Sequence, residues 1–150
     1  MHVLSTDGGA RGNPGPAAGG FVLTDAAGRV VRSGGHFLGV ATNNVAEYQA
    51  LRWGLATALH EGVRSLEVRC DSELVVRQVN GQYKVKNAVL QELHAGVGVL
   101  IKRFDAVRVV HVRREQNAAA DALANRAMDL GADVGDGIDP DAGAQDTLFP

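Results

Sequence analysis

The sequence predicts an α/β fold, in which helices flank a mixed five-stranded sheet in the order β-β-β-α-β-α-α-β-α. Apolar runs separated by glycine-rich turns fill the first forty residues, and an apolar stripe at helical spacing follows them. Strand-like and helix-like segments then alternate. Three consecutive strands predict an antiparallel section, and the later alternation makes the sheet mixed, with helices on its faces.

The individual elements follow from the spacing of apolar and turn-forming residues. The opening apolar run ends at Asp7 and continues into a turn rich in glycine and proline. The first helix is expected because Leu51, Leu55 and Leu59 recur every four residues on one face. Besides the opening run, the predicted strands are 17–25, 28–38, 65–70 and 106–112. The predicted helices are 42–61, 72–79, 87–103 and 117–130.

Composition limits the class of protein. With 150 residues, of which 45% are hydrophobic and 21% charged, the chain suits one globular domain. No apolar run approaches the roughly 20 residues needed to span a bilayer, and no signal-peptide pattern is visible at the start. Cys70 is the only cysteine, which excludes an internal disulfide. We therefore expect a cytoplasmic monomer that does not bind membranes.

Charge divides the chain into a body and a tail. Six of the 17 acidic residues lie from Asp129 onward, whereas all 15 basic residues precede it, so residues 1–128 carry a net charge of +4. This small excess is compatible with a polyanionic partner. Beyond Gly131 the sequence consists mainly of glycine, aspartate and alanine without periodicity. We expect a folded domain over 1–130 and an acidic, disordered tail over 131–150.

Four acidic residues stand at the ends of predicted elements. Two of them, Asp7 and Asp71, end strands. Glu47 lies in the first turn of a helix, and Asp121 lies early in the last helix. Such ends gather at one edge of an α/β sheet, where four carboxylates would repel one another unless cations neutralised them. Mg²⁺ or Mn²⁺ suits oxygen ligands, and two such ions about 4 Å apart support in-line attack on a phosphodiester.

Each acid also has a simpler interpretation. Glu47 fits a capping box with Asn44, three residues earlier. Asp71 could cap the helix that follows it, Asp7 could form a turn with the next glycines, and Asp121 could be a solvated helix residue. Their joint occurrence, each beside a distinctive polar cluster, favours a shared site.

The sequence around these acids resembles type 1 ribonuclease H, from about residue 3 to residue 128. The matching segments are TDGGARGNPGPAAGG at 6–20, ATNNVAEYQAL at 41–51, CDSELVVRQVNG at 70–81 and REQNAAADALAN at 114–125. They look like the family's first strand, first helix, fourth strand with the next helix, and last helix. Four matches in the right order make the resemblance specific.

The resemblance implies a ribonuclease H-like fold and an endonuclease that hydrolyses the RNA strand of RNA–DNA hybrids, leaving a 5′-phosphate. It implies two Mg²⁺ or Mn²⁺ ions, and it maps the family's catalytic, metal-binding acids onto Asp7, Glu47, Asp71 and Asp121. Asp7 would bridge both ions. Glu47 and Asp71 would complete the site nearer the leaving group, and Asp121 would complete the site that holds the attacking water.

The resemblance also implies which residues contact the hybrid. Glycines of the first turn lack Cβ atoms, so the main chain could approach a ribose and read its 2′-OH. Thr42 and Asn87 would hold a DNA phosphate, although both also fit helix caps. Tyr83 fits a core or rim aromatic equally well. The expected contacts are Gly8, Gly9, Arg11, Gly12, Asn13, Thr42, Asn43, Asn44, Tyr83, Lys84 and Asn87.

Two features depart from the family pattern. Many relatives insert a basic helix where this chain has only NGQYKVKN at 80–87. Tyr83, Lys84 and Lys86 would form a reduced substitute for it, here called the reduced handle. Many also carry a loop histidine before the last acid. Here RREQN at 113–117 contains no histidine, and whether Arg113, Arg114 or Glu115 takes over part of that work stays open.

Two other functions stay open. A hybrid-binding module without catalysis would require all four acids to occur by accident. Another nuclease of the same superfold is the second alternative. Proofreading exonucleases usually show Asp-x-Glu in the first strand, where this chain has Asp7-Gly8-Gly9.

The last residues, AQDTLFP at 144–150, combine a polar stretch with two large apolar side chains. Gln145, Leu148 and Phe149 resemble the short motif by which bacterial replication and repair proteins bind the sliding clamp. The acidic tail would then act as a tether. Alternatively, Leu148 and Phe149 fold back onto the domain's own surface.

Overall fold

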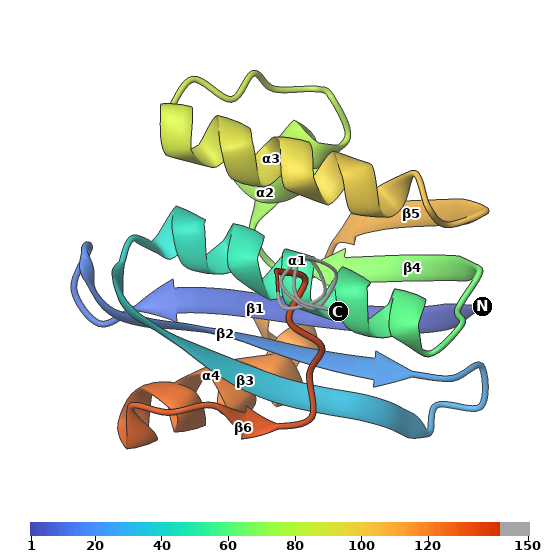
Figure 1. Cartoon of the computed structure of the whole chain (residues 1–150), viewed down its shortest axis with the longest axis horizontal. Coiled ribbons are helices and arrows are strands. Elements are labelled where there is room, and N and C mark those ends of the chain that lie inside the picture. Colours follow the sequence, from blue (N-terminus) through green and yellow to red (C-terminus); the bar gives the residue numbers. More distant parts are fainter. Residues whose placement is uncertain (142–150) are drawn as a thin grey trace, which may run out of the picture.

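The computed structural model describes residues 1–141, which form a six-stranded mixed sheet with helices on both faces (Figure 1). The strands are β1 (His2–Ala10), β2 (Gly15–Thr24), β3 (Val30–Ala41), β4 (Ser65–Cys70), β5 (Ala106–His111) and β6 (Val134–Gly135). The helices are α1 (Asn43–His60), α2 (Glu73–Val79), α3 (Ala88–Ile101) and α4 (Ala118–Leu130), with a 3-10 turn, η1 (Arg114–Asn117), before α4. The predicted fold class and order of elements are confirmed, and β6 is an addition to the five predicted strands.

The topology of the sheet brings Asp7 of β1 beside the end of β4. The strand order is β5-β4-β1-β2-β3-β6, in which β1, β2 and β3 are antiparallel and β4 and β5 run parallel to β1. The parallel register pairs Thr6 of β1 with Cys70 of β4. The residue that follows Thr6 and the residue that follows Cys70 are both aspartates, so Asp7 and Asp71 become neighbours.

Side-chain alternation along β2 gives each face of the sheet its own helix. A Cβ on Gly19 would lie 2.8 Å from the Cβ of Ala50 in α1, whereas a Cβ on Gly20 would overlap the carbonyl oxygen of Ala120 in α4. Glycines at these positions therefore let α1 and α4 pack against opposite faces of the strand at close range. The main core lies between the sheet and α1, and its largest fully buried members include Leu4, Phe21, Leu23, Tyr48, Leu51 and Leu55.

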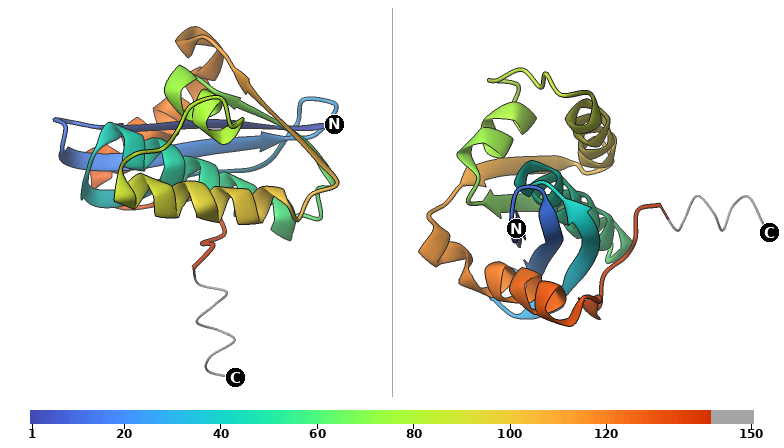
Figure 2. Two further views of the ribbon diagram at one scale, coloured as in Figure 1. Left: turned by 90° about the horizontal axis from the view of Figure 1, so that it is seen from above. Right: turned by 90° about the vertical axis from the view of Figure 1, so that its left-hand side faces the viewer.

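The described part of the predicted tail, residues 131–141, packs against the domain, whereas the sequence predicts disorder over 131–150. It continues along β3, where β6 adds an edge strand, and then runs over α1 (Figures 1 and 2). The Asp133 carboxylate accepts a hydrogen bond from the Phe37 N–H at 2.8 Å, and the Ile138 N–H donates to the Thr57 hydroxyl at 2.9 Å. Backbone and polar groups make these contacts, so apolar periodicity in the sequence does not reveal them.

No helix within residues 1–141 is long and apolar enough to cross a membrane. The predicted docking residues Gln145, Leu148 and Phe149 lie outside the described residues.

Candidate active site

The four predicted acids approach one another beside the end of β4. Asp7 lies within β1, which continues to Ala10, so the prediction that Asp7 ends a strand is wrong. Asp7 is only 8% exposed, and its carboxyl group lies near those of Glu47, Asp71 and Asp121, the last of which shares a hydrogen bond with it. Burial, reinforced by this hydrogen bond and by the neighbouring negative charges, raises the pKa of Asp7 to about 9. A carboxyl group held in this state is poised to exchange its proton for a cation.

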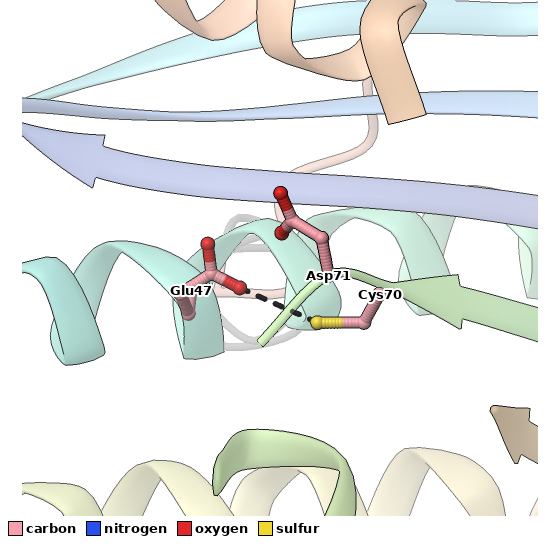
Figure 3. Close-up of side chains that lie close together, drawn as sticks. All are labelled: Glu47, Cys70 and Asp71. Carbon is pink, nitrogen blue, oxygen red and sulfur yellow. Dashed lines mark hydrogen bonds between the residues drawn. The ribbon is translucent and has the colours of Figure 1, made fainter. Parts of the chain in front are cut away.

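Glu47 is held from two sides by hydrogen-bond donors. Its Oε1 accepts a hydrogen bond from the Gly8 N–H of β1 at 2.8 Å, and its Oε2 accepts one from the Cys70 thiol of β4 at 3.3 Å (Figure 3). Burial raises the pKa of Glu47 to about 7, although the Gly8 and Cys70 hydrogen bonds oppose this shift. Burial also raises the pKa of Cys70, so this side chain is a neutral thiol donor.

The simpler interpretations of Glu47 and Asp71 as helix caps are wrong. At the start of α1, Thr42 is the cap, and its hydroxyl accepts a hydrogen bond from the Val45 N–H at 3.2 Å. At the start of α2, the cap is Ser72, which serves the same role for a backbone N–H one turn later. Both carboxylates are thereby left to the shared site.

The donor set fits a divalent cation. Glu47, Cys70 and Asp71 each offer one ligand atom, and these atoms lie within 4.8 Å of one another (Figure 3). The crowding of carboxylates around Asp7 is costly without a positive charge nearby. Oxygen donors of this kind match the preference of Mg²⁺ and Mn²⁺, so the residues present suit the ions that the sequence predicts.

A cavity of about 220 Å³ opens beside Asp7 and Asp121. Its lining includes the main chain after Asp7 and several predicted contact residues, namely Gly8, Gly9, Arg11 and Asn43. Arg114 of η1, one of the residues that precede Asp121 in place of a loop histidine, also lines it. The cavity therefore joins carboxylates to a cationic side chain and to exposed backbone.

A second cavity, of about 330 Å³, lies between the N-termini of α1 and α3. Thr42 and Asn87, both predicted to hold a DNA phosphate, line this cavity together with Asn13 and Asn44. Asn87 also caps α3, since its Oδ1 accepts a hydrogen bond from the Leu90 N–H at 3.1 Å. The capping and pocket interpretations of Thr42 and Asn87 therefore coexist. Two helix N-termini at one cavity provide a favourable field for an anion.

The turn between β1 and β2 is tied to the start of α1. Asn13 Oδ1 accepts a hydrogen bond from the Asn43 N–H at 3.1 Å, and Asn43 Oδ1 accepts one from the Ala10 N–H at 2.8 Å. Gly12 has a φ of +89°, a conformation that favours glycine. These contacts fix the turn next to Asp7, and they leave the amide nitrogens of both asparagines for a ligand.

The reduced handle at 80–87 joins α2 to α3 without a helix of its own. Tyr83 is 49% exposed, and the guanidinium of Arg77 lies over its ring at 5.4 Å from the centroid. Tyr83 is therefore a rim aromatic in a cationic setting, not a core residue. Lys84 and Lys86 belong to the same segment.

Two supporting residues were missed by sequence reasoning. Buried Asn117 donates from Nδ2 to the carbonyl oxygen of Thr6 at 2.6 Å, which fixes β1 one residue before Asp7. Cys70 stands out in the sequence only as a lone cysteine, although its place before Asp71 on a strand end is a usable signal. Both residues act on the site through hydrogen bonds that connect distant parts of the chain.

Without metal, the protein is expected to lose stability as the pH rises from 7 to 9. The folded-state pKa of Asp7, about 9, lies above its unfolded value of 3.8, so the folded protein keeps a proton that the unfolded chain has released. This contribution falls by at most about 1.4 kcal/mol per pH unit and ends near pH 9. Thermal melting in EDTA measures it, and Mg²⁺ should flatten the decline. An equal decline in Asp7→Asn, which cannot titrate there, would contradict this origin.

The chain is similar to a known protein family and to curated relatives over most of its length. Residues 5–127 match the model of the family described as reverse transcriptase-like. Ribonuclease HI of Halobacterium salinarum is 44% identical over 82% of this chain and 62% of its own length. The first curated relatives are longer, and the matched part of this chain spans 36% to 62% of their length.

Solved structures agree with the sequence relatives. The N-terminal RNase H domain of rv2228c from Mycobacterium tuberculosis, solved as a fusion with maltose binding protein, has a TM-score of 0.84 at 42% identity, covering 86% of this chain and 94% of that one. LC11-RNase H1, solved in complex with an RNA/DNA hybrid, has a TM-score of 0.83 at 43% identity, covering 87% and 99%.

Proposed function

The chain belongs to the reverse transcriptase-like family and, within it, to the type 1 ribonucleases H, and from this premise we propose that it hydrolyses the RNA strand of RNA–DNA hybrids. The observation that carries the proposal is the cluster of four carboxyl groups around buried Asp7, beside a cavity that Gly8, Gly9 and Arg11 also line. We propose an endonuclease that acts as a cytoplasmic monomer and leaves a 5′-phosphate.

The four acids would hold two divalent ions, Mg²⁺ or Mn²⁺, which activate water and stabilise the leaving oxygen of a phosphodiester. Asp7 must lose its proton for this, and the four carboxylates together make that loss favourable only when cations are bound. The Gly8 N–H keeps the Glu47 carboxylate facing β1. Asn117 fixes the strand that carries Asp7.

Substrate selection would depend on two surfaces. The main chain at Gly8 and Gly9 would accept the RNA strand, because a 2′-OH can bond to exposed backbone groups. The cavity between Thr42 and Asn87 would take a phosphate of the DNA strand at two helix N-termini. A duplex must present both features to fit, which favours a hybrid over duplexes of pure DNA.

Arg114 would take over part of the work of the missing loop histidine. It lines the same cavity as Asp7 and Asp121. A guanidinium stays charged at any working pH, so it cannot shuttle protons, but it can hold a phosphate oxygen through paired N–H groups. We therefore assign Arg114 a phosphate-binding role at the cleavage site.

One assay tests the proposed function. RNA–DNA, RNA–RNA and DNA–DNA duplexes, each labelled on one strand at a time, are incubated with the protein and Mg²⁺ or Mn²⁺. We expect cuts in the RNA of the hybrid, with 5′-phosphate ends, and none with the Asp7→Asn variant. Binding of the hybrid without cleavage would favour a binding module, and comparable cutting of DNA duplexes would favour another nuclease of the superfold.

The reduced handle is expected to make hybrid binding strongly dependent on salt. Replacing Lys84 and Lys86 by alanine should weaken hybrid binding at low salt and lower the slope of log affinity against log salt by up to about 2, because each neutralised phosphate adds roughly 0.9 to that slope. Affinity measured over a salt series tests this. Lys102→Ala, at the far end of α3, is the control for a general loss of charge. A double variant with the wild-type affinity and slope would remove the handle from the binding surface.

We also propose that the C-terminal residues Gln145, Leu148 and Phe149 bind a sliding clamp. The support is the motif itself. Removing 145–150 should abolish clamp binding and leave hybrid cleavage within about twofold, since a docking segment adds local concentration alone. A large loss of thermal stability, or no clamp binding by the intact protein, would favour the fold-back alternative.

A further inference from the structure

Cys70 is a buried polar group that the proposed reaction does not use. Its side chain is 1% exposed at the end of β4, and it precedes Asp71 directly. The thiol donates to Glu47 Oε2 at 3.3 Å (Figure 3), while the Gly8 N–H donates to Glu47 Oε1 at 2.8 Å. Both oxygens of one carboxylate are therefore held, each from a different strand.

These two hydrogen bonds differ in strength. A backbone N–H is a strong donor at a fixed position, whereas a thiol is a weak donor. A cation that approaches Glu47 Oε2 therefore displaces the thiol at little cost. Before the cation arrives, the same hydrogen bond restricts the Glu47 side chain, which would otherwise be free to turn away from the negative charge of Asp71.

We propose that Cys70 is a positioning residue, which orients Glu47 for the divalent cation through its S–H···O hydrogen bond. The inference rests on the proposed function, because it concerns the same group of carboxylates. It predicts that the hydrogen-bond donor matters at position 70, beyond the apolar volume that the side chain adds to the core. Neutral hydrogen bonds contribute enough to change the metal affinity about two- to tenfold.

Two substitutions distinguish the effect of the hydrogen-bond donor at position 70 from the effect of side-chain volume. Cys70→Ser keeps an O–H donor but buries a more polar group, so its melting temperature in EDTA should fall. Cys70→Val keeps an apolar side chain that suits a strand but cannot donate. If Cys70→Val does not fold, Cys70→Ala takes its place.

Isothermal titration with Mn²⁺ in the absence of nucleic acid gives a readout other than activity. We expect Cys70→Val to bind Mn²⁺ about two- to tenfold more weakly than the wild type, and Cys70→Ser to bind within about twofold of it, despite its lower melting temperature. The Mg²⁺ concentration for half-maximal hybrid cleavage should follow the same order.

The opposite order, or an equal loss in both variants, assigns Cys70 to core packing and overturns the inference. Wild-type affinity in Cys70→Val also overturns it. A different result would contradict the proposed function itself: a wild-type protein that binds no Mn²⁺, or an Asp7→Asn variant that binds Mn²⁺ as tightly as the wild type. The positioning role of Cys70 would then be overturned as well, whatever the Mn²⁺ affinities of the Cys70 variants.

Discussion

Replacing Asp7 by asparagine is expected to reduce hybrid cleavage by about a thousandfold or more and to stabilise the metal-free protein. Activity falls because Asp7 lies close to all the other acids, and loss of one ligand removes several kcal/mol of charge stabilisation by the ions. Stability rises because a neutral amide needs no cation and does not repel Glu47, Asp71 or Asp121.

The gain in stability depends on pH. The pKa of Asp7 is raised to about 9, whereas the unfolded chain releases this proton near 3.8, so folding of the wild type becomes less favourable as the pH rises toward 9. At pH 8 to 9 in EDTA, we expect Asp7→Asn to unfold with a free energy about 1–3 kcal/mol higher than the wild type, or roughly 2–10 °C in melting temperature.

Asp25→Asn is the matched control. Asp25 also carries one negative charge near a strand end, but hydrogen bonds from the Arg29 and Ala27 N–H groups lower its pKa. Its charged form is therefore favoured by folding, and neutralising it should lower stability slightly and leave cleavage unchanged. If both variants shift the melting temperature in the same direction, crowding of carboxylates is not the cause. Near-wild-type cleavage by Asp7→Asn would remove Asp7 from the site.

The parts of the fold and site that the sequence predicts are those carried by local patterns. The leucines of α1 predict a helix because they recur about once per turn on one face, and Leu51 and Leu55 are indeed fully buried. Three of the four acids could be selected because Asp71 follows a strand and Glu47 and Asp121 lie near helix starts, whereas Asp7 lies within β1, and parallel pairing of β1 with β4 places it beside Asp71. Turn residues and strand ends are visible before any contact between distant segments is known.

The parts that could not be predicted depend on contacts between distant segments. The Cys70 thiol forms its hydrogen bond with Glu47 only because the folded chain brings β4 and α1 together. No pattern near Cys70 in the sequence predicts that partner. The segment after Gly131 lacks an apolar stripe, which predicts disorder, yet β3 offers it an open edge and Thr57 offers it a hydroxyl. Asn117 likewise finds its partner more than a hundred residues away.

Replacing Gly8 by alanine is expected to damage both the fold and the site, although it adds only one methyl group. A Cβ at this position would overlap the backbone of Ala46 and the Glu47 nitrogen in α1. Backbone cannot turn aside as a flexible side chain can, so α1 must move away from β1.

Moving α1 has two consequences. Forced overpacking of this kind lowers the free energy of unfolding by about 1–3 kcal/mol or more. The shift also lengthens the hydrogen bond from the Gly8 N–H to Glu47 and separates Glu47 from Asp7. A displacement of about 1 Å at a reacting centre can reduce a rate about a hundredfold, so cleavage should fall by that order even below the melting temperature.

Gly9→Ala supplies the control from the next position on the same strand. A Cβ there would meet only the Asn43 Oδ1, at 3.9 Å, which is an ordinary contact. We expect its melting temperature in EDTA to equal or slightly exceed that of the wild type, because alanine restricts the unfolded chain. Circular dichroism melts and Mn²⁺ titrations of both variants test the contrast. Equal melting temperatures and equal Mn²⁺ affinities in Gly8→Ala and Gly9→Ala would show that the close approach of β1 to α1 does not hold the site together.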